Sequence, residues 1–261
     1  CVSQLKMPEI IAVANQKGGV GKTTTSVNLA AALHATGKKT LLVDLDTQGN
    51  ATTACGIDKS NLEASVYDLF VGEATADAAL VHPEANGFWV LPANKDLMAA
   101  EIQLLEFRER EFRLKQILAG ISPRFDYVLI DTPPSMNILT INALAAADGV
   151  IIPVQCEYYA LEGLTGLLET INKIQEKINP NLTIKGVLRT MFDVRNSLAG
   201  EVAGQLKRHF GNKLFWTFIP RNVRLAEAPS FGLSALAYDG NCLGAKAYVS
   251  LAKEITKKTM E

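Results

Sequence analysis

The stretch NQKGGVGKTTT, residues 15–25, decides the fold of this chain. It follows the apolar run IIAVA, residues 10–14, and leads into a segment with helical spacing. A strand, a glycine-rich turn and a helix in this order predict a phosphate-binding loop, because the turn N–H groups and the helix N-terminus both attract a polyphosphate. We expect the Lys22 ammonium to reach the β- and γ-phosphates and the Thr23 hydroxyl to bind Mg²⁺.

The loop departs from the common pattern G-x-x-x-x-G-K-[ST], because Gln16 stands at the first glycine position. Lys17 follows it, five residues before Lys22. Since Lys17 is not needed for the phosphate cradle of its own loop, the sequence suggests an additional cation that acts elsewhere. The alternative is an ordinary glycine-rich turn with solvated lysines. The agreement between glycines, lysine, threonines and flanking elements disfavours it.

Composition limits the possible classes of protein. The chain has 261 residues, 48% of them hydrophobic and 20% charged, which fits one large α/β domain or two small ones. The net charge of −1 means that any nucleic-acid contact must come from a local patch. The four cysteines form no C-x-x-C pair, which argues against a zinc or redox site and fits a reducing cytosol. No apolar run approaches the roughly 18 residues that a membrane span needs.

Apolar runs alternate with helical spacing along the whole chain. The predicted strands are residues 9–15, 40–44, 88–91, 127–131, 149–154, 184–189 and 214–219. The predicted helices are residues 22–36, 97–119, 138–146, 161–178, 198–210 and 245–258. This alternation predicts an α/β fold with a mostly parallel twisted sheet and helices on both faces. We expect one domain over residues 9–258, preceded by an N-terminal extension or expression remnant, residues 1–8.

A charged run, EFREREFRLK, occupies residues 106–115 inside the predicted helix 97–119. It contains three pairs of glutamate and a basic residue at i,i+4 spacing, each contributing about 0.3–0.5 kcal/mol on a helix. We interpret the run as a solvated helix face, with a partner surface as the alternative.

Carboxylates end two of the predicted strands. Asp44 and Asp46 follow the strand at 40–44, and Asp131 ends the strand at 127–131. Ligands of parallel sheets bind at the carboxyl ends of the strands, so we expect these side chains beside the phosphate loop, as a site for Mg²⁺ and water. The alternative is that one of them, most readily Asp44, merely caps the segment that follows.

Several motifs together resemble one known family. KGGVGKTT with DLD, then DTPPS, PVQCEYYALEGL and IPRNVRLAEAPS, is similar to the ParA/Soj branch of the deviant-Walker-A ATPases, which partition chromosomes and plasmids. The resemblance spans residues 9–258. It implies a P-loop ATPase that binds ATP or ADP with Mg²⁺ and forms an ATP-dependent sandwich homodimer. It also implies a ParB-type partner that stimulates hydrolysis, and a cytoplasmic, nucleoid-associated protein whose unstimulated turnover is slow.

The resemblance also assigns roles to residues. It makes Lys17 the signature lysine that crosses the dimer to the partner's nucleotide. It implies that Asp46 orients the attacking water with Asp44 in support, and that Asp131 lies near the metal, through water. One departure concerns Thr47, which stands where the family usually has proline and loosens that loop, so the hydrolysis rate is expected to differ. The implied nucleotide contacts are Lys17, Gly18, Gly19, Val20, Gly21, Lys22, Thr23 and Thr24 around the phosphates, with Pro220 and Asn222 around the adenine.

A basic cluster extends from Lys185 to Arg224, a stretch that contains eight lysines and arginines but only two acidic residues. Such a cluster suits phosphate contacts that do not depend on base sequence, and no helix-turn-helix or zinc pattern accompanies it. From the cluster alone, a solvated basic surface is equally plausible. The resemblance implies that Arg195 and Arg224 bind double-stranded DNA nonspecifically.

Three other functions compete with a DNA-associated partition ATPase. A MinD-like membrane switch needs an amphipathic C-terminal helix, but the spacing of Tyr248, Leu251, Ala252 and Ile255 is typical of a helix that docks on a core, so we expect no membrane binding. An electron-transfer protein like the nitrogenase iron protein needs paired cysteine ligands. A DNA-coating or repressor protein without enzymatic activity is the third, and an ATPase assay would distinguish it.

Overall fold

The computed structural model describes residues 7–258, so most of the expected N-terminal extension, residues 1–6, lies outside the described part. Its centre is one sheet with the strand order β3-β2-β4-β1-β5-β6, in which every neighbouring pair is parallel. This confirms the predicted sheet. The strands are β1 (Glu9–Val13), β2 (Thr40–Asp44), β3 (Trp89–Leu91), β4 (Tyr127–Asp131), β5 (Gly149–Gln155) and β6 (Thr183–Thr190).

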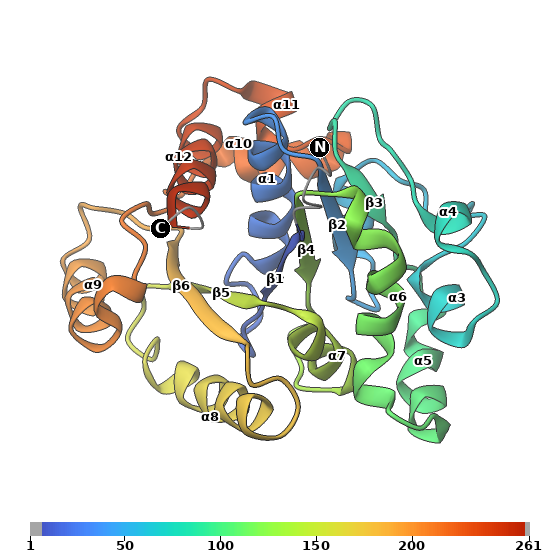
Figure 1. Ribbon diagram of the computed structural model, residues 1–261. Coiled ribbons are helices and arrows are strands. Elements are labelled where there is room, and N and C mark those ends of the chain that lie inside the picture. Colours follow the sequence, from blue (N-terminus) through green and yellow to red (C-terminus); the bar gives the residue numbers. More distant parts are fainter. Residues whose placement is uncertain (1–6, 259–261) are drawn as a thin grey trace, which may run out of the picture.

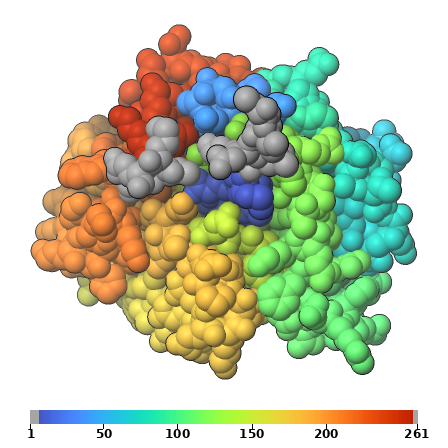
Figure 2. Space-filling model, viewed as in Figure 1, coloured from blue at the N-terminus to red at the C-terminus, as the bar shows by residue number. Residues whose placement is uncertain are grey.

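Helices cover both faces of this sheet, and Figure 1 shows α10, α11 and α12 gathered beside α1. The two edges of the sheet are β3 and β6. In Figure 2, the orange-to-red C-terminal part forms one side of the surface, and the cyan-to-green part forms the other. The helices are α1 (Lys22–Ala35), α2 (Asn50–Ala54), α3 (Val66–Val71), α4 (Ala76–Ala79), α5 (Leu97–Gln103), α6 (Arg113–Ile121), α7 (Ile138–Ala146), α8 (Glu162–Lys177), α9 (Ser197–Phe210), α10 (Val223–Glu227), α11 (Ala235–Asp239) and α12 (Leu243–Lys258).

The core consists of two apolar layers, one on each face of the sheet. Successive residues of a strand enter opposite layers, as Ile11 and Ala12 of β1 do, because side chains alternate along a strand. Both are fully buried, which explains why the strands are continuous apolar runs. Helix α12 adds the side chains expected to dock on the core, all at most 3% exposed: Tyr248, Leu251, Ala252 and Ile255.

The predicted seventh strand, residues 214–219, was wrong. This segment runs beside the edge strand β6 but makes only one parallel bridge within its span, from Leu214 to Val187. The N–H groups of residues 215 and 219 donate to β6 carbonyls at 3.1 and 2.8 Å, but side chains take the backbone groups between them. Arg189 donates to the carbonyls of residues 215 and 216 at 3.1 and 3.0 Å, and the Glu254 carboxylate accepts the N–H groups of residues 216 and 217 at 2.9 and 3.0 Å. The segment is therefore an irregular edge whose backbone groups are shared between β6 and side chains.

The predicted single helix 97–119 was also wrong, because the chain breaks between α5 and α6. Glu109 has a φ of 54°, in the left-handed region that ends a helix. The buried Asn142 of α7 fixes the break, since its Nδ2 donates to the Arg110 carbonyl at 2.9 Å and its Oδ1 accepts from the Leu114 N–H at 3.0 Å. A buried amide that needs both partners outweighs surface charge pairs of a few tenths of a kcal/mol. Arg110 instead pairs with its neighbour Glu111 at 3.3 Å.

Candidate nucleotide site

The glycine-rich loop lies between β1 and α1, as the motif predicts. Gly19 and Gly21 have φ values of 75° and 85°, a backbone that side chains disfavour, and Gly21 directly precedes the first turn of α1. No side chain caps that first turn, so its N–H groups are available to an anion. Asn15 anchors the start of the loop, because its Nδ2 donates to the Pro153 carbonyl at 2.7 Å and its Oδ1 accepts from the Lys17 N–H at 2.9 Å.

Lys22 and Thr23 begin α1 beside the buried carboxylate of Asp131. The Thr23 hydroxyl donates to Asp131 Oδ2 at 2.8 Å, and the Ser26 hydroxyl donates to Oδ1 at 2.7 Å. Burial raises the pKa of Asp131 to about 7, and the nearby charge of Asp44 adds to this effect. Burial lowers the pKa of Lys22, although the charges of Asp131 and Asp46 oppose that shift. The Lys22 ammonium donates to the Lys17 carbonyl at 3.3 Å, and it lies in a poorly hydrated site where the charges of Asp131 and Asp46 act on it.

Asp44 is adjacent to Asp131 across the β2–β4 ladder, and its carboxylate is fully engaged. Its Oδ1 accepts from the Asp46 N–H at 3.0 Å, and its Oδ2 accepts from the N–H and hydroxyl of Thr52 at 2.8 and 2.7 Å. Burial raises its pKa to about 6, against the effect of those hydrogen bonds. Asp44 thus fixes the loop that presents Asp46 and anchors α2. Thr52 is a supporting residue that the sequence analysis did not identify.

Asp46 is 7% exposed and retains acceptor capacity. Its Oδ1 accepts from the Gln48 N–H at 3.0 Å, and its Oδ2 lies 3.4 Å from Asn50 Nδ2. A carboxylate that is only partly used, next to a phosphate loop, can accept a proton or orient a water.

Lys17 lies outside this buried cluster, although it belongs to the same loop. Its ammonium forms an ion pair of 2.8 Å with Glu157, in the segment after β5, and the two side chains are 42% and 50% exposed. Glu157 falls within the motif PVQCEYYALEGL, yet its partnership with Lys17 joins residues 140 positions apart and was not foreseen. The two lysines of the loop therefore have different surroundings, one buried and one exposed.

A cavity of about 160 Å³ lies beside the loop. Pro220 and Asn222 line it, together with Met191 of the segment after β6 and Tyr248 of α12. Within the described part of the chain, the buried Asn222 Oδ1 has no hydrogen-bond partner. An orphaned acceptor in a pocket beside a phosphate loop is suited to the amino group of an adenine.

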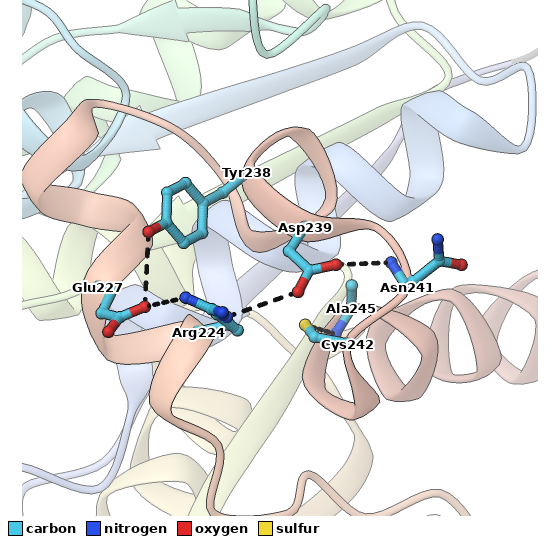
Figure 3. Close-up of polar contacts among 7 residues, drawn as sticks. All are labelled: Arg224, Glu227, Tyr238, Asp239, Asn241, Cys242 and Ala245. Atoms are coloured by element: carbon cyan, nitrogen blue, oxygen red, sulfur yellow. Dashed lines mark hydrogen bonds and ion pairs between the residues drawn. The ribbon is translucent and has the colours of Figure 1, made fainter.

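Arg195 and Arg224, the arginines assigned to DNA, already have carboxylate partners. Arg195 is 86% exposed at its side chain and contacts Asp193 at 2.8 Å. Arg224, which is 49% exposed, pairs with Glu227 at 2.8 Å and with Asp239 at 3.5 Å, and its guanidinium lies 5.9 Å from the ring centre of Tyr238. Figure 3 shows this cluster, in which two carboxylates from different helices face Arg224. Arg195 is thus the more accessible cation.

Residues 7–258 contain no helix that is long and apolar enough to cross a membrane.

Comparison with known proteins gives consistent matches over nearly the whole chain. Residues 8–184 match a family described as an AAA domain. The sporulation initiation inhibitor protein Soj of Bacillus subtilis is 51% identical over 249 residues, which are 95% of this chain and 98% of that protein. The chromosome partitioning protein ParA of Caulobacter vibrioides is 49% identical over 251 residues, 95% of this chain and 94% of that protein.

Among solved structures, the fold is similar to a Mycobacterium smegmatis protein that is named cobyrinic acid a,c-diamide synthase and contains bound ADP and magnesium. The TM-score is 0.86 at 38% identity, covering 98% of this chain and 96% of that chain. The ParA and Soj relatives, at 49% and 51% identity, share more of the sequence than this structure does. The chain therefore belongs to the ParA/Soj family of chromosome-partitioning ATPases.

Proposed function

We propose that this ATPase forms an ATP-dependent sandwich homodimer, that the dimer binds double-stranded DNA nonspecifically, and that a ParB-type protein releases it by stimulating ATP hydrolysis. The observation that carries the proposal is the contrast between the two lysines of one loop. Lys22 is 8% exposed and feels the charges of Asp131 and Asp46, whereas the Lys17 ammonium is exposed and pairs with the exposed Glu157. An exposed cation at the rim of a nucleotide site is suited to a nucleotide held by a second subunit. We infer a cytoplasmic, nucleoid-associated protein.

The residues present fit a magnesium nucleotide. The loop glycines and the uncapped start of α1 suit the phosphates, and the orphaned Asn222 oxygen suits the base. Thr23 would bind the metal directly, and Asp131, which already accepts the Thr23 hydroxyl, would hold it through water. When bound, Mg²⁺ neutralises charge on the β- and γ-phosphates during transfer. Related solved structures contain ADP or an ATP analogue with magnesium, which supports the same ligands here.

The remaining residues explain why turnover would be slow. Asp46 is placed to orient the attacking water, and Asp44 holds the Asp46 loop through the Asp46 N–H. Lys17 would complete charge neutralisation only in the partner's site, so a monomer lacks one cation of its catalytic set. We therefore expect an unstimulated turnover far below the typical ~10 s⁻¹ of enzymes.

An ATPase assay tests this function. Turnover is measured with the protein alone, with plasmid-length DNA, with a ParB-type protein, and with both additions. We expect low basal turnover and a clear increase only when both are present. A basal rate that is already high, or one that neither addition changes, would contradict the proposed cycle.

The DNA-binding residues are tested by charge reversal in the ATP-bound protein. Arg195→Glu together with Arg224→Glu should abolish DNA binding and leave ATP binding intact. Because the Arg195 side chain is 86% exposed, against 49% for Arg224, and has one carboxylate partner rather than two, the Arg195→Glu change alone should be the more damaging single variant. DNA affinity retained by the double variant at moderate salt would reject the assignment. Co-sedimentation with anionic vesicles tests the MinD-like alternative, for which the buried apolar face of α12 offers no support.

A further inference from the structure

We call the cavity of about 160 Å³ beside the phosphate loop the base pocket. A second cavity shares a wall with it. Its volume is about 530 Å³, and its cations are Arg195, Arg221 and Lys246. Pro220 and Arg221 line both cavities. Helix α12 also serves both, because Tyr248 lines the base pocket whereas Lys246 lines the basic groove. We call this second cavity the basic groove.

The segment Thr190–Arg195, which leaves the end of β6, joins the two cavities. Thr190 and Met191 line the base pocket, and the four residues that follow line the basic groove. The Thr190 hydroxyl, 2% exposed with its residue, donates to the carbonyl of Val20 in the phosphate loop at 2.7 Å. One end of the segment is therefore tied directly to the loop that would hold the phosphates.

Met191, the second residue of this segment, has an unfavourable backbone conformation. Its φ is 49°, and it is one of only two residues other than glycine with positive φ among residues 7–258. Left-handed backbone at a residue with a side chain is strained and persists only where the surroundings enforce it. The next residue is held by its N–H, which Phe192 donates to the Ile219 carbonyl at 2.9 Å. Because the strain is maintained by fixed contacts on both sides, loss of either contact would release it through a backbone change at Met191.

At the other end of the segment, the Asp193 carboxylate binds the side chain of Arg195. Asp193 accepts from Arg195 Nε at 3.0 Å and from Nη2 at 2.8 Å, and its Oδ1 also accepts from the Arg195 N–H at 3.0 Å. A guanidinium that is bound at two points by a carboxylate is less available to a phosphate, because both anions use the same donors. Asp193 therefore competes for the donors of Arg195 with any anion that enters the basic groove.

We propose that the segment Thr190–Arg195 couples nucleotide occupancy to the basic groove, by a backbone change at Met191 that alters the pairing of Arg195 with Asp193. The proposal deepens the proposed function and rests on it for the identity of the groove's ligand, a nucleic-acid phosphate. Coupling requires an element with two states that both sites bias. Thr190 connects this element to the phosphate loop, and Arg195 connects it to the groove.

Hydrogen exchange of the whole chain tests the coupling without DNA. The amides of Arg195 and Asn196 both donate to Asp193, so their exchange reports the state of the segment. With a saturating non-hydrolysable ATP analogue and Mg²⁺, we expect their exchange rates to change by about tenfold in the native protein. In Thr190→Val, which loses the hydroxyl bound to Val20, the change should fall below about twofold at nucleotide saturation. An unchanged rate in the native protein, or a native-like response in Thr190→Val, would overturn the proposal.

A second pair of variants covers the case in which Thr190→Val does not fold. Met191→Gly removes the left-handed penalty and should reduce the nucleotide response of the same amides, because glycine adopts both conformations freely. Met191→Ala shortens the side chain but keeps the penalty, so it should respond as the native protein does. Equal responses of the two variants would reject the role of backbone strain.

A DNA-binding assay distinguishes a failure of this inference from a failure of the proposed function. Asp193→Asn should tighten DNA binding in the absence of nucleotide by several-fold, because it weakens the internal competitor. Asp58→Asn is the matched control, since Asp58 accepts an N–H two residues later in the same way but forms no ion pair among the described residues. If Asp193→Asn does no more than this control, Asp193 is not a competitor and the proposal fails at that step. If exchange shows coupling but the native protein binds no DNA, the DNA role is wrong and the coupling stands.

Discussion

Replacement of Lys22 by alanine should weaken ATP binding strongly. Lys22 is 8% exposed, and the nearby charges of Asp131 and Asp46 act on it in a buried site, so water cannot substitute for its ammonium. A hydrogen bond to a charged group contributes about 1.5–3 kcal/mol. At about 1.4 kcal/mol for each factor of ten, the loss corresponds to about a 10- to 150-fold increase in Kd.

Lys17→Ala is the matched variant, because it removes the same side chain from the same loop. Its ion pair with Glu157 is exposed, and such pairs contribute about 0–1 kcal/mol to stability. We therefore expect nearly native folding and an ATP affinity within about threefold of the native value, since a surface lysine contributes little to its own site. ATP-dependent dimerisation or hydrolysis should be lost instead.

Fluorescence titration with a labelled ATP analogue measures both affinities, and light scattering with ATP and Mg²⁺ measures dimerisation. Thermal melting without nucleotide confirms that each variant is folded. The reasoning is refuted if Lys17→Ala weakens ATP binding as much as Lys22→Ala does. It is also refuted if Lys17→Ala forms native dimers and hydrolyses ATP at the native rate.

Two further predictions concern stability. The raised pKa values of Asp44 and Asp131, about 6 and about 7, mean that the folded state holds protons more tightly than the unfolded state, so their stabilisation is complete below pH ~4 and is lost as pH rises through ~7. Without metal and nucleotide, the Tm should therefore be lower at pH ~8 than at pH ~5.5, and Asp131→Asn should reduce that difference; a Tm that rises over this range would contradict the sign. Gly186→Ala should lower stability by about 1–3 kcal/mol, because a Cβ would overlap the buried ring of Phe215. Gly200→Ala, in an open helical position, should not destabilise the protein, and equal melting shifts for the two glycine variants would exclude overpacking as the cause.

Local sequence accounts for most of the sheet and for the phosphate loop. A strand buried on both faces must be apolar along its whole length, and a loop that approaches a phosphate needs glycines, so both leave a signal within a few residues. The predicted helix at residues 138–146 matches α7 at both ends. The short helices α2, α3, α4, α10 and α11 escaped prediction, because four to six residues carry too little periodicity to distinguish a helix from a loop.

The errors and omissions arise where residues distant in sequence compete for the same groups. The backbone at 214–219 looks like a strand until Arg189 and Glu254 bind its polar groups. A helix over 97–119 is consistent with the local sequence. It is broken because the buried Asn142, distant in sequence, binds two backbone groups of this segment. Such competition is decided by burial, which the sequence does not show.

The sequence by itself determined the parallel sheet, the phosphate loop with its two lysines, and the three aspartates at strand ends. Those features follow from local chemistry and from the rule that parallel strands present their carboxyl ends at one edge. Only the tertiary structure decided how these side chains are used: Lys17 paired with Glu157, Asp44 saturated by Thr52, and Arg224 held by two carboxylates. The physical reason is that a hydrogen bond or ion pair depends on distance and burial, and folding sets both between residues that can be more than a hundred positions apart.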